Sequence, residues 1–143
     1  MMRRVSLIFA VVSVLFLGSA HRVWASSDHI SAEQVTTDDK AFFQKIRLAV
    51  ENHDAKWMAK NIGFPITVSL NGKRVPIKSE KSFITNYDII VTKSIVDAVL
   101  SQDENDMFKN WQGIMVGHGQ LWFNEYMDTD KTHSFYLIIA INN

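Results

Sequence analysis

The stretch FPITVSLNGKRVPIK, residues 64–78, decides the fold class, because the spacing of apolar residues changes there. From Ile66 onward, apolar and polar residues alternate, which is typical of a strand with one buried face. Asn71 and Gly72 then separate two such runs, and this dipeptide favours the tight turn of a β-hairpin. The stretch therefore predicts two antiparallel strands. Pro76 indicates a strand start or a sheet edge, since proline has no N–H to donate.

The segment before the hairpin has helical spacing instead. In VTTDDKAFFQKIRLAVENHD, residues 35–54, Thr36 or Thr37 is expected to cap a helix whose first turn holds two aspartates. The apolar stripe along this helix consists of Phe42, Ile46, Ala49 and Val50. A second, short helix is expected in AKWMAKNI, residues 55–62.

Helices and then strands follow the hairpin in separate blocks. Ser79 is expected to cap a long helix over residues 80–91. Thr92 is expected to cap a short continuation. The last third predicts three strands, residues 108–117, 119–127 and 133–142. A Gly-His-Gly sequence centred on His118 is the expected turn between the first two.

Helices segregated from an antiparallel sheet predict an α+β fold. We expect a curved sheet that wraps around the long helix of residues 80–91. The expected contacts join Phe83, Tyr87 and Ile90 of the helix to Ile114, Val116, Trp122 and Ile138 of the sheet.

The order of these elements resembles that of the NTF2-like superfamily, also called cystatin-like or SnoaL-like. The resemblance is carried by FFQKIRLAVENHDAKWMAKNIGFPITV (42–68), NGK (71–73), FITNYDIIVT (83–92) and NWQGIMVGHGQLWFN (110–124). It covers residues 36–141 and implies one domain, residues 36–143. In that domain, N-terminal helices and a long helix would pack on a curved antiparallel sheet in the shape of a cone. The superfamily includes isomerases, cyclases, hydrolases, scaffolds and non-catalytic binding modules, so the resemblance implies a fold without choosing an activity.

The N-terminus predicts export. Two arginines are followed by VSLIFAVVSVLFLG, residues 5–18, which has the length of a signal-peptide apolar region and is short for a membrane span. Cleavage is expected after Ala20 or Ala25, and the polar residues that follow favour Ala25. This makes residues 1–25 a signal peptide and residues 26–35 a flexible segment, in a periplasmic or secreted protein. The alternative is a retained anchor helix.

Composition limits the partners. The chain has no cysteine, so an exported form must be stable without disulfides. Removal of residues 1–25 takes away three of the 15 basic residues and none of the 15 acidic ones, leaving a net charge of −3. That balance argues against nucleic acid, or an anionic membrane after cleavage, as a partner. No sequence feature calls for a cofactor.

Three residues are weak candidates for catalysis. His118 has the right pKa class for proton transfer, but it also suits a turn, where His tolerates unusual backbone angles. Tyr87 and Asp88 together resemble the tyrosine and carboxylate of ketosteroid isomerases. They are adjacent on a helix, however, and so point about 100° apart, as a core tyrosine and a solvated carboxylate would.

Aromatic residues give the better prediction of a binding site. Trp122 and Phe123 must point to opposite faces of one strand, so one aromatic ring of the pair faces outward. The residues expected to bind a ligand or partner are Trp57, Tyr87, Trp111, Trp122 and Asn124. The four histidines after Ala25 are too far apart in sequence to predict a metal site, and DTDKTH, residues 128–133, lacks the full calcium-loop pattern.

Two functions remain open. The first is a non-catalytic exported binding module that recognises a protein partner or a small apolar ligand through an aromatic-rich sheet face. The alternative is a small pocket enzyme of the SnoaL or ketosteroid-isomerase type, which would use His118 or Asp88 with Tyr87. A homodimer formed through the sheet is a further alternative for the partner.

Overall fold

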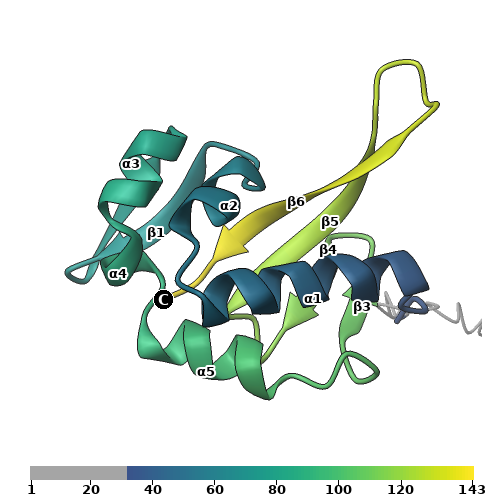
Figure 1. Cartoon of the computed structure of the whole chain (residues 1–143), viewed down its shortest axis with the longest axis horizontal. Coiled ribbons are helices and arrows are strands. Elements are labelled where there is room, and N and C mark those ends of the chain that lie inside the picture. The colour runs from purple at the N-terminus through teal and green to yellow at the C-terminus, as the bar shows by residue number, and fades with distance from the viewer. Residues whose placement is uncertain (1–31) are drawn as a thin grey trace, which may run out of the picture.

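The computed structural model describes residues 32–143, which form helices and two antiparallel sheets (Figure 1). The α+β class is therefore confirmed. The predicted signal peptide, residues 1–25, and residues 26–31 lie outside the described residues. In chain order the elements are α1 (Thr37–Glu51), α2 (Ala55–Lys60), β1 (Ile66–Leu70), β2 (Lys73–Ile77), α3 (Glu80–Thr85), α4 (Tyr87–Ile90), α5 (Lys93–Ser101), β3 (Phe108–Asn110), β4 (Gly113–Val116), β5 (Leu121–Met127) and β6 (Ser134–Ile141).

The two N-terminal helices begin where the sequence predicts. Thr36 caps α1, and its side chain accepts a hydrogen bond from the N–H of Asp39, whose carboxylate accepts one from the N–H of Thr36. This reciprocal arrangement is a capping box. Asp54 caps α2 by accepting from the N–H of Trp57. The predicted apolar stripe of α1 is buried: Phe42, Ile46, Ala49 and Val50.

The hairpin of β1 and β2 is confirmed. Its strands pair in register from Ile66 with Ile77 to Leu70 with Lys73. Asn71 and Gly72 form the turn with φ of 52° and 74°, the left-handed values that this dipeptide adopts readily. The hairpin forms a two-stranded sheet of its own.

The second sheet has four strands in the order β3-β4-β5-β6, one more than the sequence predicts. The expected single strand over residues 108–117 is wrong, because a turn at Trp111 and Gln112 folds it into β3 and β4. The side chain of Asn110 accepts from the N–H of Gln112 at 2.9 Å. Gly113 follows with φ of 139°, which side-chain-bearing residues rarely adopt.

The expected long helix over residues 80–91 is also wrong. The helix divides at Asn86 into α3 and α4. The Asn86 side chain donates to the carbonyl of Ser82 and so caps the C-terminal end of α3. The buried Phe83, Tyr87 and Ile90 do lie along these helices, but α3 packs against α2 and α4 against β1.

The helix that lies on the four-stranded sheet is α1 (Figure 1). Its Phe42 ring lies 5.5 Å from that of Phe123 in β5 and 5.0 Å from that of Tyr136 in β6, centroid to centroid. The buried apolar side chains of the sheet all point to this inner face: Ile114, Val116, Leu121, Phe123, Ile138 and Ile141. Trp122, which we expected among them, points to the other face. Beyond β4, β5 and β6 continue as a two-stranded arm (Figure 1).

We predict that Gly113→Ala destabilises the protein by about 3 kcal/mol, which a urea titration of the free energy of unfolding would measure. A Cβ at Gly113 would lie 2.7 Å from the carbonyl oxygen of Phe123, and the φ of 139° is strained for alanine.

Gly72→Ala is the matched control. Gly72 also has a positive φ, of 74°, but a Cβ there meets no atom within 4 Å. Its cost should be only that of the left-handed backbone, about 1 kcal/mol. Equal losses at Gly72 and Gly113 would mean that the close approach to Phe123 contributes nothing.

Candidate functional site

The outer face of the four-stranded sheet carries a row of apolar side chains. The strand pairing aligns Phe108 with Met115, Met115 with Trp122, and Trp122 with Ala140. Each of these residues is half-buried, and none belongs to the core or to the side chains packed against it. They pack on their neighbours across the strands, and their outward surfaces are covered by no described helix or strand.

The apolar face continues onto the arm. The rings of Tyr126 and Phe135 stack with centroids 5.9 Å apart, and the side chains are 39% and 44% exposed. Asn124 pairs with Leu137, and this pair lies between the Tyr126–Phe135 pair and Trp122. None of the outward positions of β3–β6 is charged: they are Phe108, Asn110, Met115, Trp122, Asn124, Tyr126, Phe135, Leu137, Ile139 and Ala140. We call this surface the outer sheet face.

A shallow hollow of about 240 Å³ lies on the outer sheet face. A bulge between Trp122 and Phe123 puts two residues of β6, Ile139 and Ala140, on its wall. Amides complete the lining: Gln112, and Asn142, whose side chain donates to the carbonyl of Gly119 at 2.7 Å. Apolar walls with amide groups at the rim suit an apolar group that carries one or two hydrogen-bonding atoms.

Of the five predicted binding residues, two lie on the outer sheet face and a third lies in the turn that joins β3 to β4. Trp122 and Asn124 are outward residues of β5, and Trp111 is 75% exposed in the β3–β4 turn, next to Gln112 of the hollow. The other two lie elsewhere. Tyr87 is in the core of the helical side, and Trp57 lines a separate groove.

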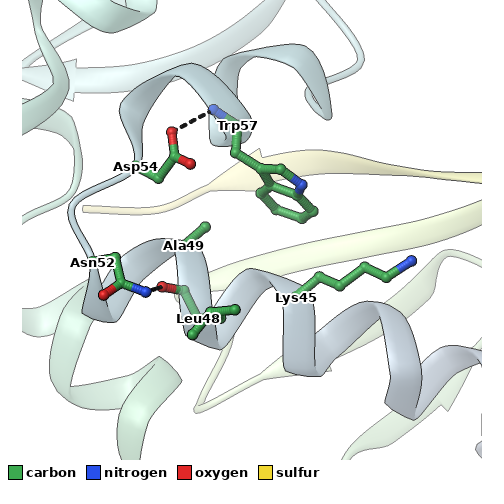
Figure 2. A pocket seen from close by; sticks show the side chains of 6 residues that line it. All are labelled: Lys45, Leu48, Ala49, Asn52, Asp54 and Trp57. Carbon is green, nitrogen blue, oxygen red and sulfur yellow. Dashed lines mark hydrogen bonds between the residues drawn. The ribbon is translucent and has the colours of Figure 1, made fainter.

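That groove, of about 160 Å³, runs between α1 and α2 (Figure 2). Leu48 and Ala49 of α1 form one side and the indole of Trp57 the other. Asn52 and Asp54 stand at the end where the two helices are joined (Figure 2). Lys45 extends at the opposite end.

His118 lies in the predicted turn between β4 and β5. The flanking Gly117 and Gly119 have φ of 65° and 103°, and the N–H of His118 donates to the side chain of Gln120. The imidazole is exposed and makes no hydrogen bond within residues 32–143. A general base is normally oriented by a second group, and His118 has none here.

Tyr87 and Asp88 point apart, as their helix spacing predicts. Tyr87 is only 6% exposed, and its hydroxyl has no hydrogen-bond partner among the described residues. Burial, together with the negative charges of Asp88 and Asp54, raises the pKa of Tyr87. Asp88 is exposed. Neither residue lines either of the two hollows, and the space between helices and sheet is filled by phenylalanine and isoleucine side chains.

One polar cluster on the inner face was missed by the sequence analysis. The carboxylate of Asp39, which is fully buried, accepts from Lys109 Nζ of β3 at 2.7 Å and from the Tyr136 hydroxyl of β6 at 2.9 Å. It also accepts from the backbone of Thr36 at 2.7 Å. The capping position of Asp39 was recognisable in the sequence, but its partners lie 70 and 97 residues away.

The electrostatics of this cluster are those of a structural clamp. Burial raises the pKa of Asp39, but hydrogen bonds from Lys109, Thr36 and Tyr136 outweigh it, so the pKa of Asp39 lies below its ordinary value. Burial and the Asp39 carboxylate raise the pKa of Tyr136. Both groups therefore keep one protonation state near neutrality, and the carboxylate has its acceptors occupied. Neither property suits proton transfer.

Comparison of the chain with protein-family models, with curated proteins and with solved structures found no match. The NTF2-like resemblance therefore stays a prediction. Within residues 32–143, no group of three or more metal-ligating side chains gathers, and no helix has the length and apolar character that a membrane crossing requires.

We predict that Asp39→Asn lowers the free energy of unfolding at pH 7 by about 3 kcal/mol, because it leaves Lys109 without its anion in a site that is nearly closed to water. The native pKa of Asp39 is depressed, so its contribution is complete above the unfolded-state pKa of about 4 and is lost as the pH falls through the native value. The gap between the two proteins should therefore narrow below pH 4 in urea titrations.

Asp106→Asn serves as the control for charge alone, since Asp106 is exposed and its carboxylate accepts no hydrogen bond within residues 32–143. It should change stability by less than about 0.5 kcal/mol at any pH. If the Asp39→Asn deficit stayed constant between pH 7 and pH 2, the ionised carboxylate would not be the source of the stabilisation.

Proposed function

We propose that this protein is an exported, non-catalytic binding module that recognises a protein partner, or a small apolar ligand, through its outer sheet face. The observation that carries the proposal is that the outer sheet face is uncharged and rich in aromatic side chains. Helix α1 covers only the opposite, inner face of the sheet. Contiguous apolar surface of this kind on a soluble protein marks an interaction site more often than an unused surface.

The composition of the face also supports a protein partner. Tryptophan, tyrosine, phenylalanine and methionine are the residue types enriched at the centre of protein interfaces, and charged residues are depleted there. Trp122 is surrounded by Met115 and Ala140 of neighbouring strands, with Trp111 at the edge. A rigid sheet also holds these side chains in place before binding, which reduces the entropy lost on association.

The enzyme alternative has less support. It requires His118 or Asp88 to meet Tyr87 at an apolar pocket. The imidazole of His118 and the carboxylate of Asp88 are exposed, the hydroxyl of Tyr87 is buried, and the described interior is packed. Export itself is supported only by the basic start and the apolar run of residues 5–18.

We predict that Trp122→Glu abolishes partner binding while the protein stays folded. Trp122 is half-buried on the outer sheet face and outside the core, so a carboxylate there remains in contact with water until a partner covers it. The measurement is affinity purification of the tagged protein from its exported compartment, followed by native mass spectrometry. The parent protein should bring down a stoichiometric partner that the variant loses.

Leu100→Glu is the matched control, because Leu100 is also an exposed apolar residue, at 44%, but lies on α5 at the helical side. It should retain the partner. A parent protein recovered as a dimer that Trp122→Glu dissociates would identify the partner as a second copy. A partner retained by Trp122→Glu, or lost equally with Leu100→Glu, would show that the outer sheet face is not the binding surface.

A further inference from the structure

The groove between α1 and α2 is a second, chemically different hollow. Its volume of about 160 Å³ exists because Ala49, at the floor, has a small side chain between Leu48 and the indole of Trp57. A cavity of about 150 Å³ accommodates a benzene-sized group in other proteins. Leu48 is 59% exposed, and the Phe42 ring packs on Trp57 with centroids 5.9 Å apart, which supports the indole from the core side.

The end of the groove where the helices join offers a free acceptor oxygen on Asp54. Asp54 uses Oδ1 to accept from the N–H of Trp57, and its Oδ2 accepts no hydrogen bond from the described residues. Asn52 donates through Nδ2 to the carbonyl of Leu48, and its Oδ1 points away from Trp57 and Asp54 (Figure 2). A free carboxylate oxygen selects a hydrogen-bond donor, and its negative charge selects a cationic one.

The C-terminus of α1 favours a cation at the same end, and the Asp54 carboxylate offsets the positive N-terminus of the short helix α2 that begins there. The C-terminus of α1 carries the negative end of the helix dipole, and no basic residue lies in its last turn. Glu51 adds a further negative charge there. The π face of a tryptophan such as Trp57 also attracts cations.

Lys45 does not oppose this arrangement. It lies seven residues before Asn52 on α1, which places it about 10 Å away along the helix axis, close to one Debye length at moderate salt. Figure 2 shows its side chain extending away from the closed end. The groove is thus negative where it closes and positive where it opens.

We propose that the groove between α1 and α2 binds an ammonium group carried on an aromatic body. The ring lies over Ala49, between Leu48 and Trp57, and the ammonium donates to Asp54 Oδ2. A free aromatic amine and an aromatic N-terminus of a peptide share this chemistry. This site is independent of the outer sheet face.

The test uses three probes of one shape: 2-phenylethylammonium, 3-phenylpropionate and 2-phenylethanol. Binding to the purified protein is followed by the indole N–H resonance of Trp57 in NMR titrations at about 0.1 M salt, where the charge of Lys45 is largely screened. The ammonium should bind with a dissociation constant of about 1 mM, as one ring and one charged contact at an open site allow. The carboxylate should not bind, and the alcohol should bind about fivefold more weakly than the ammonium.

Two variants separate shape from charge. Asp54→Asn keeps a capping side chain for α2 but removes the charge, so affinity for the ammonium should fall about fivefold and affinity for the alcohol should not change. Ala49→Leu should fill the groove and abolish binding of both. Asp106→Asn, away from the groove, should leave all affinities unchanged.

A phenylalanine-initiated peptide, compared with its N-acetylated form, distinguishes the two sources of the ammonium. Tighter binding of the free peptide than of 2-phenylethylammonium would identify a peptide N-terminus, and the reverse a free amine. The proposal is overturned if the carboxylate binds as well as the ammonium, if the alcohol does, or if no probe shifts the Trp57 resonance. Loss of outer-face binding in Trp122→Glu would affect none of these results.

Discussion

The carboxylate of Asp39 joins three parts of the chain that are distant in sequence, and the arrangement of the described domain depends on it. It closes the capping box of α1, accepts from Lys109 of β3 and accepts from the Tyr136 hydroxyl of β6. These contacts hold the start of α1 against both edge strands of the sheet, β3 and β6. Because the group is fully buried, its negative charge is tolerated only with its partners in place.

The clamp determines which surfaces remain open. With α1 held on the inner face, the apolar side chains of that face are buried under Phe42 and its neighbours, and the outer sheet face has no helix to cover it. The same placement sets α1 beside α2, where the small side chain of Ala49 leaves a groove. One face of the sheet thus contributes stability, while the opposite face and the groove remain uncovered by the described helices and strands. The two open surfaces differ in chemistry, since the outer sheet face is uncharged and the groove is polar at both ends.

Local signals were read correctly where a single short stretch determines the conformation. The cap at Thr36 and the Asn71-Gly72 turn each depend on backbone preferences of neighbouring residues, and both are confirmed. The errors arose where a periodic pattern was extended too far. The apolar positions of residues 80–91 fit one helix, yet the chain turns at Asn86, because α3 must reach α2 while α4 must reach β1.

The sequence by itself determined the α+β class, the hairpin, the positions of most helices and the aromatic richness of the last strands. These follow from interactions between residues a few positions apart, which the sequence displays directly. Only the tertiary structure decided that Trp122 faces outward and that Asp39 meets Lys109 and Tyr136. The face of the sheet to which a strand side chain points depends on strand register and on the side that α1 covers. The burial of the Asp39 charge depends on partners 70 or more residues away. Such choices are made by packing of the whole chain, which no local pattern records.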